Sequence, residues 1–458
     1  MRFIHLNLLL LLSPLLTPAE GQSVYGLKDC ISIGLERNFS ILIAKNDEKI
    51  SKNNFSLGNA GFLPTVDLKG QNNGSVNNTK FNFLDGTNSS SNGAYNISTG
   101  GSATLGLTIF KGFNAVISYK KLGELNQVGQ LNTQLTVENF ISDIVSGYYN
   151  YILQVQLMNN LKYALTLSRE RLRIDEDRYI LGSGSKLEVL QSRVYVNSDS
   201  SNLSRQNEVI RSAQIRLNQL MAVEELSNLF SSSDTTIDVN PGLLFGTLLE
   251  ATLVNNTSLR IASKNKTISD YDYKLALSRS YPYLNFTGGY NYNLSTYTQS
   301  TTKKQTMNGL NYGLTLGVNL YDGNNKRREI KNSSIDRENK DLRYREVEQG
   351  VRADLLTIFS AYGNNLRLIS LEEQNFQTAK ENLDIALERY KLGSLSGIDL
   401  REVQKSLLDA RERLISAHYM TKLAEISLQL ISGKIMDNIF CICTGAGCKY
   451  CKINHMIV

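Results

Sequence analysis

Proline, tryptophan and histidine are scarce in this chain of 458 residues, which has five prolines, no tryptophan and three histidines. Two prolines, Pro14 and Pro18, lie close to the N-terminus, so only Pro64, Pro241 and Pro282 interrupt the remaining sequence. A proline inside a helix costs about 3 kcal/mol, and a chain nearly free of proline can therefore hold long helices.

The scarcity of histidine and the small charge excess argue against an enzyme and against a nucleic-acid-binding protein. Neither H-E-x-x-H nor G-x-S-x-G occurs, so we expect no catalytic residues, no cofactor and no enzymatic activity. The net charge is +6 and is spread along the chain, which argues against a nucleic-acid partner.

The N-terminal segment MRFIHLNLLLLLSPLLTPAEGQ has the pattern of a secretory signal peptide. Arg2 precedes an apolar run from about Leu8 to Leu16, and the small residues Ala19 and Gly21 suit cleavage. The run is shorter than the roughly 20 residues that a membrane-spanning helix needs. We expect a signal peptide over residues 1–21 and an exported protein that is soluble or crosses a membrane as a β-barrel.

The sequence contains an internal two-fold repeat. The segments GFLPTVDLKG (61–70) and SYPYLNFTGG (280–289) align on prolines 218 residues apart, and Arg178-Tyr179 recurs at Arg389-Tyr390 after 211 residues. The predicted organisation is a first repeat over 22–230, a linker over 231–242, a second repeat over 243–433 and a Cys-rich tail over 434–458.

Each repeat contains two segments with alternating apolar and polar residues, which predicts four strands near 65–72, 101–110, 283–294 and 309–320. Polar loops are expected over residues 73–98 and 295–308. The polar face carries mostly Asn, Thr and Gly, which is typical of a water-filled barrel, although a soluble sandwich alternates in the same way. Four strands cannot close a barrel, so several chains would have to share one.

The predicted helices are unusually long. No proline occurs from Asn114 to about Tyr179, a distance of close to 100 Å for a helix. Apolar and small residues in this segment and in the last helix recur at steps of three and four. They are Ile141, Val145, Tyr148, Ile152 and Val155, and Leu400, Val403, Leu407, Ala410, Leu414 and Ala417. This spacing is typical of a coiled coil and also of an ordinary helical bundle.

With these features the chain resembles the TolC-like outer-membrane efflux protein family over about residues 25–433. The resemblance rests on the repeat, on ERNFS and GFLP, on LYDG (320–323) and on RY-x-L-G-S, which occurs twice. A departure is Phe39, where the family usually has proline; Thr257 stands at the matching position of the second repeat.

The resemblance implies a mainly α fold with a transmembrane β part. Each chain of a homotrimer would give four strands to one 12-stranded outer-membrane β-barrel and two helical hairpins to a periplasmic α-helical coiled-coil tunnel. The localisation would be the outer membrane, in contact with its lipid, with the helical part in the periplasm.

The resemblance also implies an outer-membrane channel, the exit duct of a tripartite efflux or type I secretion system. Its partners would be a periplasmic adaptor and a proton-driven or ATP-driven inner-membrane pump, and its cargo small toxic molecules or proteins. The sequence leaves the cargo and the pump open. A surface-exposed coiled-coil structural protein or adhesin trimer is the alternative.

The two small-residue segments predict the turns of the helical hairpins, at 181–186 and 392–397. Their glycines suit a turn and their serines, Ser185 and Ser396, suit helix N-caps. By resemblance these tips dock the adaptor, although Gly and Ser would form a tight turn in any case. The expected docking residues are Arg178, Tyr179, Leu181, Gly182, Ser183, Arg389, Tyr390, Leu392, Gly393 and Ser394.

Two acidic residues three apart, Asp399 and Glu402, begin the last helix and share one of its faces. By resemblance this face lines the tunnel entrance, where three copies would form acidic rings that attract cations. Glu188 is the matching residue of the first repeat. We expect these three carboxylates to form the entrance constriction; ordinary stabilisation of a helix N-terminus is the alternative.

The tail carries four cysteines, Cys441, Cys443, Cys448 and Cys451, outside the segment that resembles the family. C-x-C and C-x-x-C have the spacing of metal ligands and also of disulfides in an oxidising compartment. A dispensable extension, disulfides and a weak candidate metal site all remain open.

Overall fold

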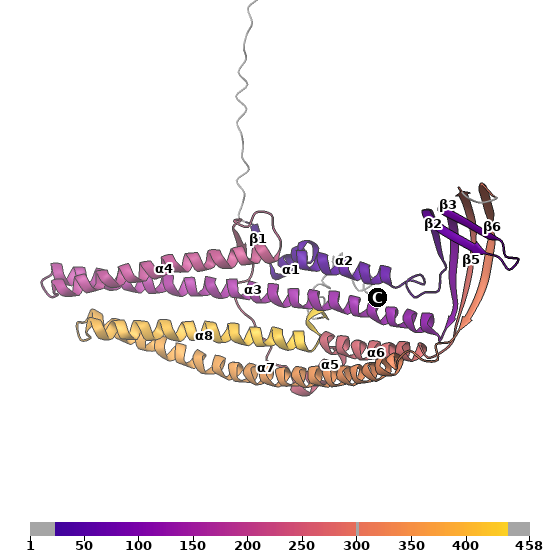
Figure 1. Cartoon of the computed structure of the whole chain (residues 1–458). Coiled ribbons are helices and arrows are strands. Elements are labelled where there is room, and N and C mark those ends of the chain that lie inside the picture. Colours follow the sequence, from indigo (N-terminus) through magenta and orange to yellow (C-terminus); the bar gives the residue numbers. More distant parts are fainter. Residues whose placement is uncertain (1–22, 299–301, 438–458) are drawn as a thin grey trace, which may run out of the picture. The chain divides into compact units, whose positions relative to one another are not determined.

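The computed structural model describes residues 23–298 and 302–437 of the chain (Figure 1). The expected signal peptide and the four tail cysteines lie outside these residues. The chain forms two compact units, and each takes segments from both repeats. Unit 1 contains residues 23–38, 141–242 and 360–427, and unit 2 contains residues 39–140, 243–359 and 428–437.

Two very long helices contribute residues to both units. The helix α3 spans Asn114–Ile180 and α7 spans Asn325–Lys391, and each has 67 residues. At 1.5 Å per residue each is about 100 Å long. Neither contains proline, and this is the condition that the sequence predicted for helices of this length.

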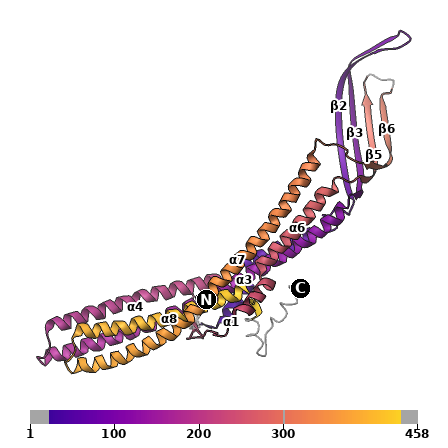
Figure 2. The same cartoon turned by 90° about the horizontal axis from the view of Figure 1, so that it is seen from below.

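In unit 1 each long helix turns back into a second helix of 35 residues. The α3 helix is followed by α4 (Lys186–Leu220), and α7 is followed by α8 (Gly397–Ile431). The predicted apolar stripes are largely buried, because Ile141, Tyr148 and Leu400 have exposed fractions of 0 %. Figure 2 shows the two hairpins, drawn in magenta and in orange to yellow.

A short parallel pair, β1 (Ser23–Tyr25) and β4 (Phe230–Ser232), also lies in unit 1, beside the first helix α1 (Leu27–Arg37). The strand β4 includes the first two residues of the segment expected to be a linker, 231–242, so main-chain pairing orders the start of that segment. The sequence did not indicate it, because three residues are too few to show an alternating pattern.

Unit 2 holds a four-stranded antiparallel sheet in the order β2-β3-β5-β6. The strands are β2 (Thr65–Asn82), β3 (Asn88–Lys111), β5 (Tyr283–Tyr297) and β6 (Lys304–Gly317). Three helices accompany it, α2 (Phe39–Asn54), α5 (Phe245–Asn255) and α6 (Thr257–Ser278). Within the described residues, β2 and β6 each pair with one neighbour, so both are edge strands.

The register keeps one face of the sheet apolar. Leu68, Ala103, Tyr290 and Leu310 form one cross-strand row, and the adjacent row is Asp67, Thr104, Gly289 and Asn311. Side chains of adjacent rows point to opposite faces. The apolar face is bare in the single chain, since Leu310 is 83 % exposed.

The strands differ in length from the sequence prediction. The expected polar loop over 73–98 was wrong, because β2 continues to Asn82 and β3 begins at Asn88. Main-chain pairing needs no apolar side chain, so these Asn- and Ser-rich segments pair without the alternating pattern that predicts strands. At the other edge β6 begins earlier, at Lys304, and ends at Gly317 and not at residue 320.

Equivalent asparagines anchor the two repeats in the same way. The amide of Asn38 donates a hydrogen bond of 2.9 Å to the carbonyl of Leu220, and that of Asn256 donates one of 2.9 Å to Ile431. Each carbonyl belongs to the C-terminal end of a returning helix, α4 or α8. The internal repeat is therefore preserved in specific contacts as well as in the order of elements.

Among the described residues, no helix is both long and apolar enough to cross a membrane.

Candidate functional site

The two hairpin tips in unit 1 have matching main-chain geometry. The first tip occupies residues 181–185 and the second residues 392–396, between the ends of their helices. Gly182 has φ +78° and Gly393 has φ +76°, a left-handed conformation that glycine adopts without a side-chain penalty. Each glycine N–H donates to the carbonyl of the residue three positions earlier, at 3.1 and 3.0 Å, so the two turns close alike.

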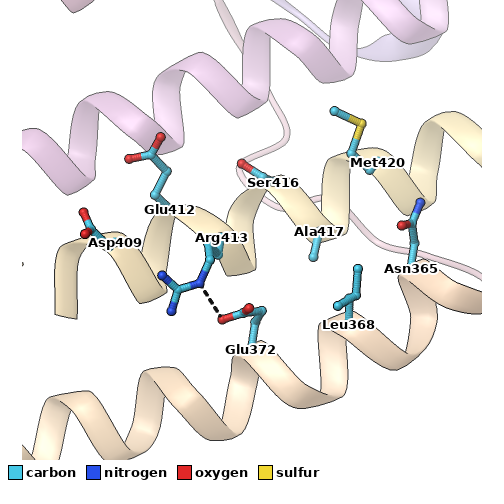
Figure 3. Close-up of a pocket in the computed structure, with 9 residues that line it drawn as sticks. All are labelled: Asn365, Leu368, Glu372, Asp409, Glu412, Arg413, Ser416, Ala417 and Met420. Atoms are coloured by element: carbon cyan, nitrogen blue, oxygen red, sulfur yellow. Dashed lines mark hydrogen bonds and ion pairs between the residues drawn. The ribbon is translucent and has the colours of Figure 1, made fainter. Parts of the chain in front are cut away.

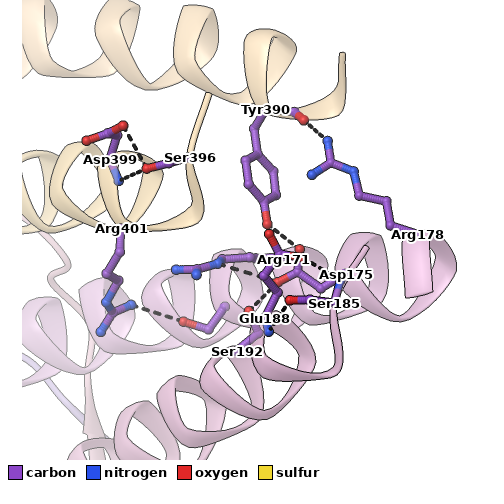
Figure 4. Close-up of polar contacts among 11 residues, drawn as sticks. Arg171, Asp175, Arg178, Ser185, Glu188, Ser192, Tyr390, Ser396, Asp399 and Arg401 are labelled. Carbon is purple, nitrogen blue, oxygen red and sulfur yellow. Dashed lines mark hydrogen bonds and ion pairs between the residues drawn. The ribbon is translucent and has the colours of Figure 1, made fainter. Parts of the chain in front are cut away.

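Both returning helices begin with the predicted serine caps. The amide of Glu188 donates to the hydroxyl of Ser185 at 3.2 Å, and the carboxylate of Glu188 accepts from the amide of Ser185 at 2.8 Å. At the second tip, the amide of Asp399 donates to the hydroxyl of Ser396 at 3.1 Å, and that hydroxyl donates to the Asp399 carboxylate at 2.7 Å. Figure 4 shows both caps.

Two of the three predicted entrance carboxylates take part in these helix caps. Glu188 and Asp399 each contact their own N-cap serine, which is the structural role that the sequence left as an alternative. Glu402 has no such contact and is exposed. All three carboxylates are exposed in the single chain, so their assignment to an entrance constriction stays a prediction.

The repeated Arg-Tyr pair is placed differently at the two tips. Tyr179 is 45 % exposed, whereas Tyr390 is 2 % exposed. The hydroxyl of Tyr390 donates to the carboxylate of Asp175 on α3. Burial and this hydrogen bond raise the pKa of Tyr390 to about 12. Tyr390 therefore joins the two hairpins and does not lie on the surface that was predicted to dock a partner.

Arg178 also connects the hairpins. Its guanidinium donates to the main-chain carbonyl of Tyr390 and lies over the tyrosine ring, 4.6 Å from the centroid. The remaining tip residues stay available to a partner, with Leu181 and Leu392 at 80 and 82 % exposed. Their role in docking stays a prediction.

An apolar cluster lies around Tyr390, and a buried polar network lies beside it. Apolar residues of α3, α7 and α8 contribute to the cluster, namely Leu167, Ile174, Leu383, Ala386, Leu400 and Leu407. In the network, Asp175 accepts from Ser192 as well as from Tyr390, and Arg171 lies 3.7 Å from the same carboxylate. Both charged side chains are almost completely buried.

A second cluster of polar side chains lies on α3, α4 and α8. Arg401 on α8 makes two hydrogen bonds with Asp199 on α4, of 3.0 and 2.9 Å, and Ser168 also donates to Asp199. The Tyr195 ring faces two guanidinium groups, those of Arg171 at 5.0 Å and Arg401 at 4.9 Å. These contacts connect the second hairpin to both helices of the first.

The sequence alone did not predict a role for these polar residues. The available signal was the position of Arg171, Asp175 and Asp199 on helix faces that also carry core residues, where a charged side chain needs a partner. The sequence does not indicate which partner it finds, because the contacting residues are up to 233 positions apart.

A groove of about 530 Å³ lies between α7 and α8 (Figure 3). Arg413 donates to Glu372 across it at 3.0 Å, and Asp409, Glu412 and Met420 also line it. The groove contains none of the predicted site residues.

The comparisons with known proteins agree with this architecture. Residues 248–434 match the family described as outer membrane efflux protein. The chain is 27 % identical to the outer membrane protein TolC of Vibrio cholerae over 199 residues, which cover 42 % of this chain and 44 % of that protein. The match thus spans less than half the length of this curated relative.

Solved structures support the fold over most of the chain. The outer membrane channel CmeC of Campylobacter jejuni matches with a TM-score of 0.72 at 16 % identity, over 90 % of this chain and 88 % of that one. The outer membrane protein VceC of Vibrio cholerae matches with a TM-score of 0.72 at 14 % identity, over 89 and 96 %. At such identities the likeness shows the fold, which is the mainly helical channel fold that the sequence predicted.

The repeat-by-repeat architecture, the family match of the second repeat and the fold agree with one another. The chain therefore has the fold of the solved outer membrane channels, and its residues 248–434 match the outer membrane efflux protein family.

Proposed function

We propose that the protein is the exit duct of a tripartite efflux or type I secretion system. It would pass small toxic molecules or proteins from a pump across the periplasm and the outer membrane. The observation that carries the proposal is the four-stranded sheet, which has one apolar face, one polar face and two edge strands.

The edge strands favour a homotrimer. An exposed edge strand offers unpaired N–H and C=O groups that another chain can bind. Pairing of β6 in one chain with β2 in the next would join three sheets into a closed 12-stranded barrel. The bare apolar face, with Leu310 and Tyr312 more than four-fifths exposed, would then contact lipid, and the polar face would line the pore.

The hairpin tips are proposed as the docking surface for a periplasmic adaptor, which in turn would bind the inner-membrane pump. Two exposed leucines, Leu181 and Leu392, occupy equivalent positions at matching turns. A partner with a repeated apolar contact could bind both tips in the same manner. Tyr390 is not part of this surface, since it is buried between the hairpins.

Asp399 and Glu402 are proposed to form the constriction at the tunnel entrance, with Glu188 beside them. Three copies would present rings of carboxylates to passing ions, and such rings attract and hold cations. The capping contact of Asp399 is compatible with this role, because a carboxylate that accepts one hydrogen bond retains other lone pairs for a cation.

The test is single-channel conductance of the purified protein in a planar bilayer, with the oligomer mass measured alongside. A trimer with discrete openings is expected, and Mg²⁺ should reduce its current. The pair Asp399→Ala/Glu402→Ala should weaken the block by Mg²⁺.

A matched control is available on the same helix. Asp409 and Glu412 are also three residues apart, but they line the groove between α7 and α8. The pair Asp409→Ala/Glu412→Ala should leave the block unchanged. A monomer, or a trimer that never conducts, would contradict the exit-duct proposal. If Mg²⁺ blocks the two double variants equally, only the assignment of Asp399 and Glu402 to the constriction is contradicted.

A further inference from the structure

The ribbon formed by β2 and β3 extends well past the other two strands. The last pair between β3 and β5 is Asn96 with Tyr297, and Asn96 faces Ser75 on β2. The β2–β3 pairing continues from there to Asn82 and Asn88. At about 3.3 Å per residue, the seven steps from Ser75 to Asn82 make a two-stranded projection of about 23 Å.

The projection is polar along its length but apolar at its end. Its strands consist mainly of Asn, Ser, Thr and Gly, yet Phe81, Phe83 and Leu84 are 54, 52 and 110 % exposed. The two phenylalanine rings stack with centroids 5.9 Å apart. Three neighbouring bare apolar side chains on a polar ribbon indicate a contact surface.

The turn that presents these residues is ordered. The carboxylate of Asp85 accepts from the amide and the hydroxyl of Thr87, at 2.9 and 2.7 Å, and Gly86 has φ +81°. The hydrogen bonds from Thr87 lower the pKa of Asp85. Phe83 also donates its amide to Thr87, so the ribbon pairs up to the turn.

The direction of the phenylalanines follows from the strand alternation. On β2 the apolar face carries the even-numbered Val66 and Leu68, and the odd-numbered residues belong to the polar face. The bulge in the ribbon lies on β3, where Asn92 and Gly93 stand opposite Asn78, so the alternation of β2 is not interrupted. Phe81 and Phe83 therefore lie on the face that continues the pore lining.

We propose that Phe81, Phe83 and Leu84 of the three chains meet above the barrel and form an apolar plug over its outer mouth. This inference rests on the proposed trimer. With strands about 4.8 Å apart and tilted by about 40°, a 12-stranded barrel has a radius of about 12 Å, which is shorter than the projection. The bulge supplies a bend in the ribbon, and burial of three apolar tips against one another removes them from water.

Lipid of the surrounding membrane is a poorer partner for these residues. The projection begins where the β5 pairing ends, and its phenylalanines lie on the face opposite to Val66 and Leu68, which would contact lipid. The partner that fits the position and the face is the same tip of another copy.

The test replaces Phe83 by the photocrosslinking residue p-benzoylphenylalanine in the full-length protein, in intact outer membranes. Illumination should link chains to dimers and trimers. The matched control replaces Asn82, which is also exposed and is adjacent but belongs to the opposite face. Crosslinked chains should be several-fold more abundant from position 83 than from position 82.

A second measurement is conductance of Phe81→Ser/Phe83→Ser/Leu84→Ser, which should show a several-fold higher frequency of opening than the unmodified trimer. Equal crosslinking from both positions, crosslinks to lipid only, or unchanged opening would overturn the plug. The oligomer mass and conductance of the unmodified protein report separately on the exit duct, so failure of the plug and failure of the duct are distinguishable.

Discussion

Arg401 binds Asp199 through two hydrogen bonds, of 3.0 and 2.9 Å, although the two residues are 202 positions apart. The Asp199 side chain is 6 % exposed and that of Arg401 is 22 % exposed, so the pair is largely removed from water. It connects the returning helix of the second hairpin to that of the first. Near the tips, the hairpins are thus held together by polar contacts as well as by apolar packing.

Removal of one partner from this pair should be costly. Arg401→Ala leaves the Asp199 carboxylate buried with Ser168 as its remaining donor, and an uncompensated buried charge costs about 3–5 kcal/mol. The free energy of unfolding, measured by denaturant titration of the detergent-solubilised protein, should fall by about that amount. Arg401→Ala/Asp199→Asn should recover much of the loss. A single variant as stable as the unmodified protein would contradict a stabilising role for the pair.

Tyr390→Phe should loosen the hairpin contact while it keeps the ring. Only the hydroxyl donor to one carboxylate oxygen of Asp175 is lost, while Ser192 still donates to the other oxygen, and a buried acceptor atom left without a partner costs about 1–3 kcal/mol. On the proposed function, the channel should open more often in a planar bilayer. The control is Tyr163→Phe, at a tyrosine that is 38 % exposed. Equal effects of the two variants would show that the Asp175 contact is not responsible.

The same tyrosine predicts an alkaline transition. Its pKa is raised from 10.0 to about 12, so its contribution to stability is fully present below pH 10 and is lost as the pH rises through about 12. The unfolding free energies of the unmodified protein and of Tyr390→Phe should therefore converge over this range. Parallel curves would contradict the assignment.

Glu138 should control the start of α6. Its carboxylate is 2 % exposed and accepts hydrogen bonds from Thr257 at 2.9 and 2.8 Å, and from Gln134 at 2.7 Å. Glu138→Ala leaves the buried Thr257 hydroxyl without this acceptor, so we expect a loss of about 1–3 kcal/mol. Glu138→Gln keeps one acceptor oxygen and should cost less. The measurement is denaturant unfolding of both variants.

The pH dependence separates the two variants further. Burial raises the pKa of Glu138, so its stabilising contribution is fully present below its unfolded pKa of 4.5 and is lost as the pH rises through the higher folded value. Glu138→Gln cannot ionise and should lack this loss. The stability difference between Glu138→Gln and the unmodified protein should therefore change from about pH 4 to neutral pH. A difference that stays constant over this range would contradict the raised pKa of Glu138.

Two glycines of the first tip should respond differently to alanine. Gly182 has φ +78° and open space around it, so Gly182→Ala should cost about 1 kcal/mol of backbone strain. At Gly184 an added Cβ would lie 2.9 Å from the Cβ of Arg178 and 3.1 Å from the amide of Tyr179. Gly184→Ala should therefore destabilise more. The measurement is thermal unfolding of the two variants. A lower unfolding temperature for Gly182→Ala than for Gly184→Ala would contradict this account of the turn.

The sequence by itself determined the features that depend on local pattern. Long helices follow from the absence of proline, the two tips from Gly182 and Gly393, and the helix starts from Ser185 and Ser396. The sheet faces follow from residue alternation. Each of these properties depends on residues a few positions apart, and neighbouring side chains act on the backbone directly.

Tertiary structure decided what depends on distant partners. Tyr179 and Tyr390 occur in the same motif, yet only Tyr390 is buried, because Asp175 and the apolar cluster surround it. The length of the β2–β3 ribbon was likewise decided by main-chain pairing between Asn- and Ser-rich strands that show no apolar alternation. The free energy of such contacts depends on which elements meet in space, and residue order along one element does not specify that.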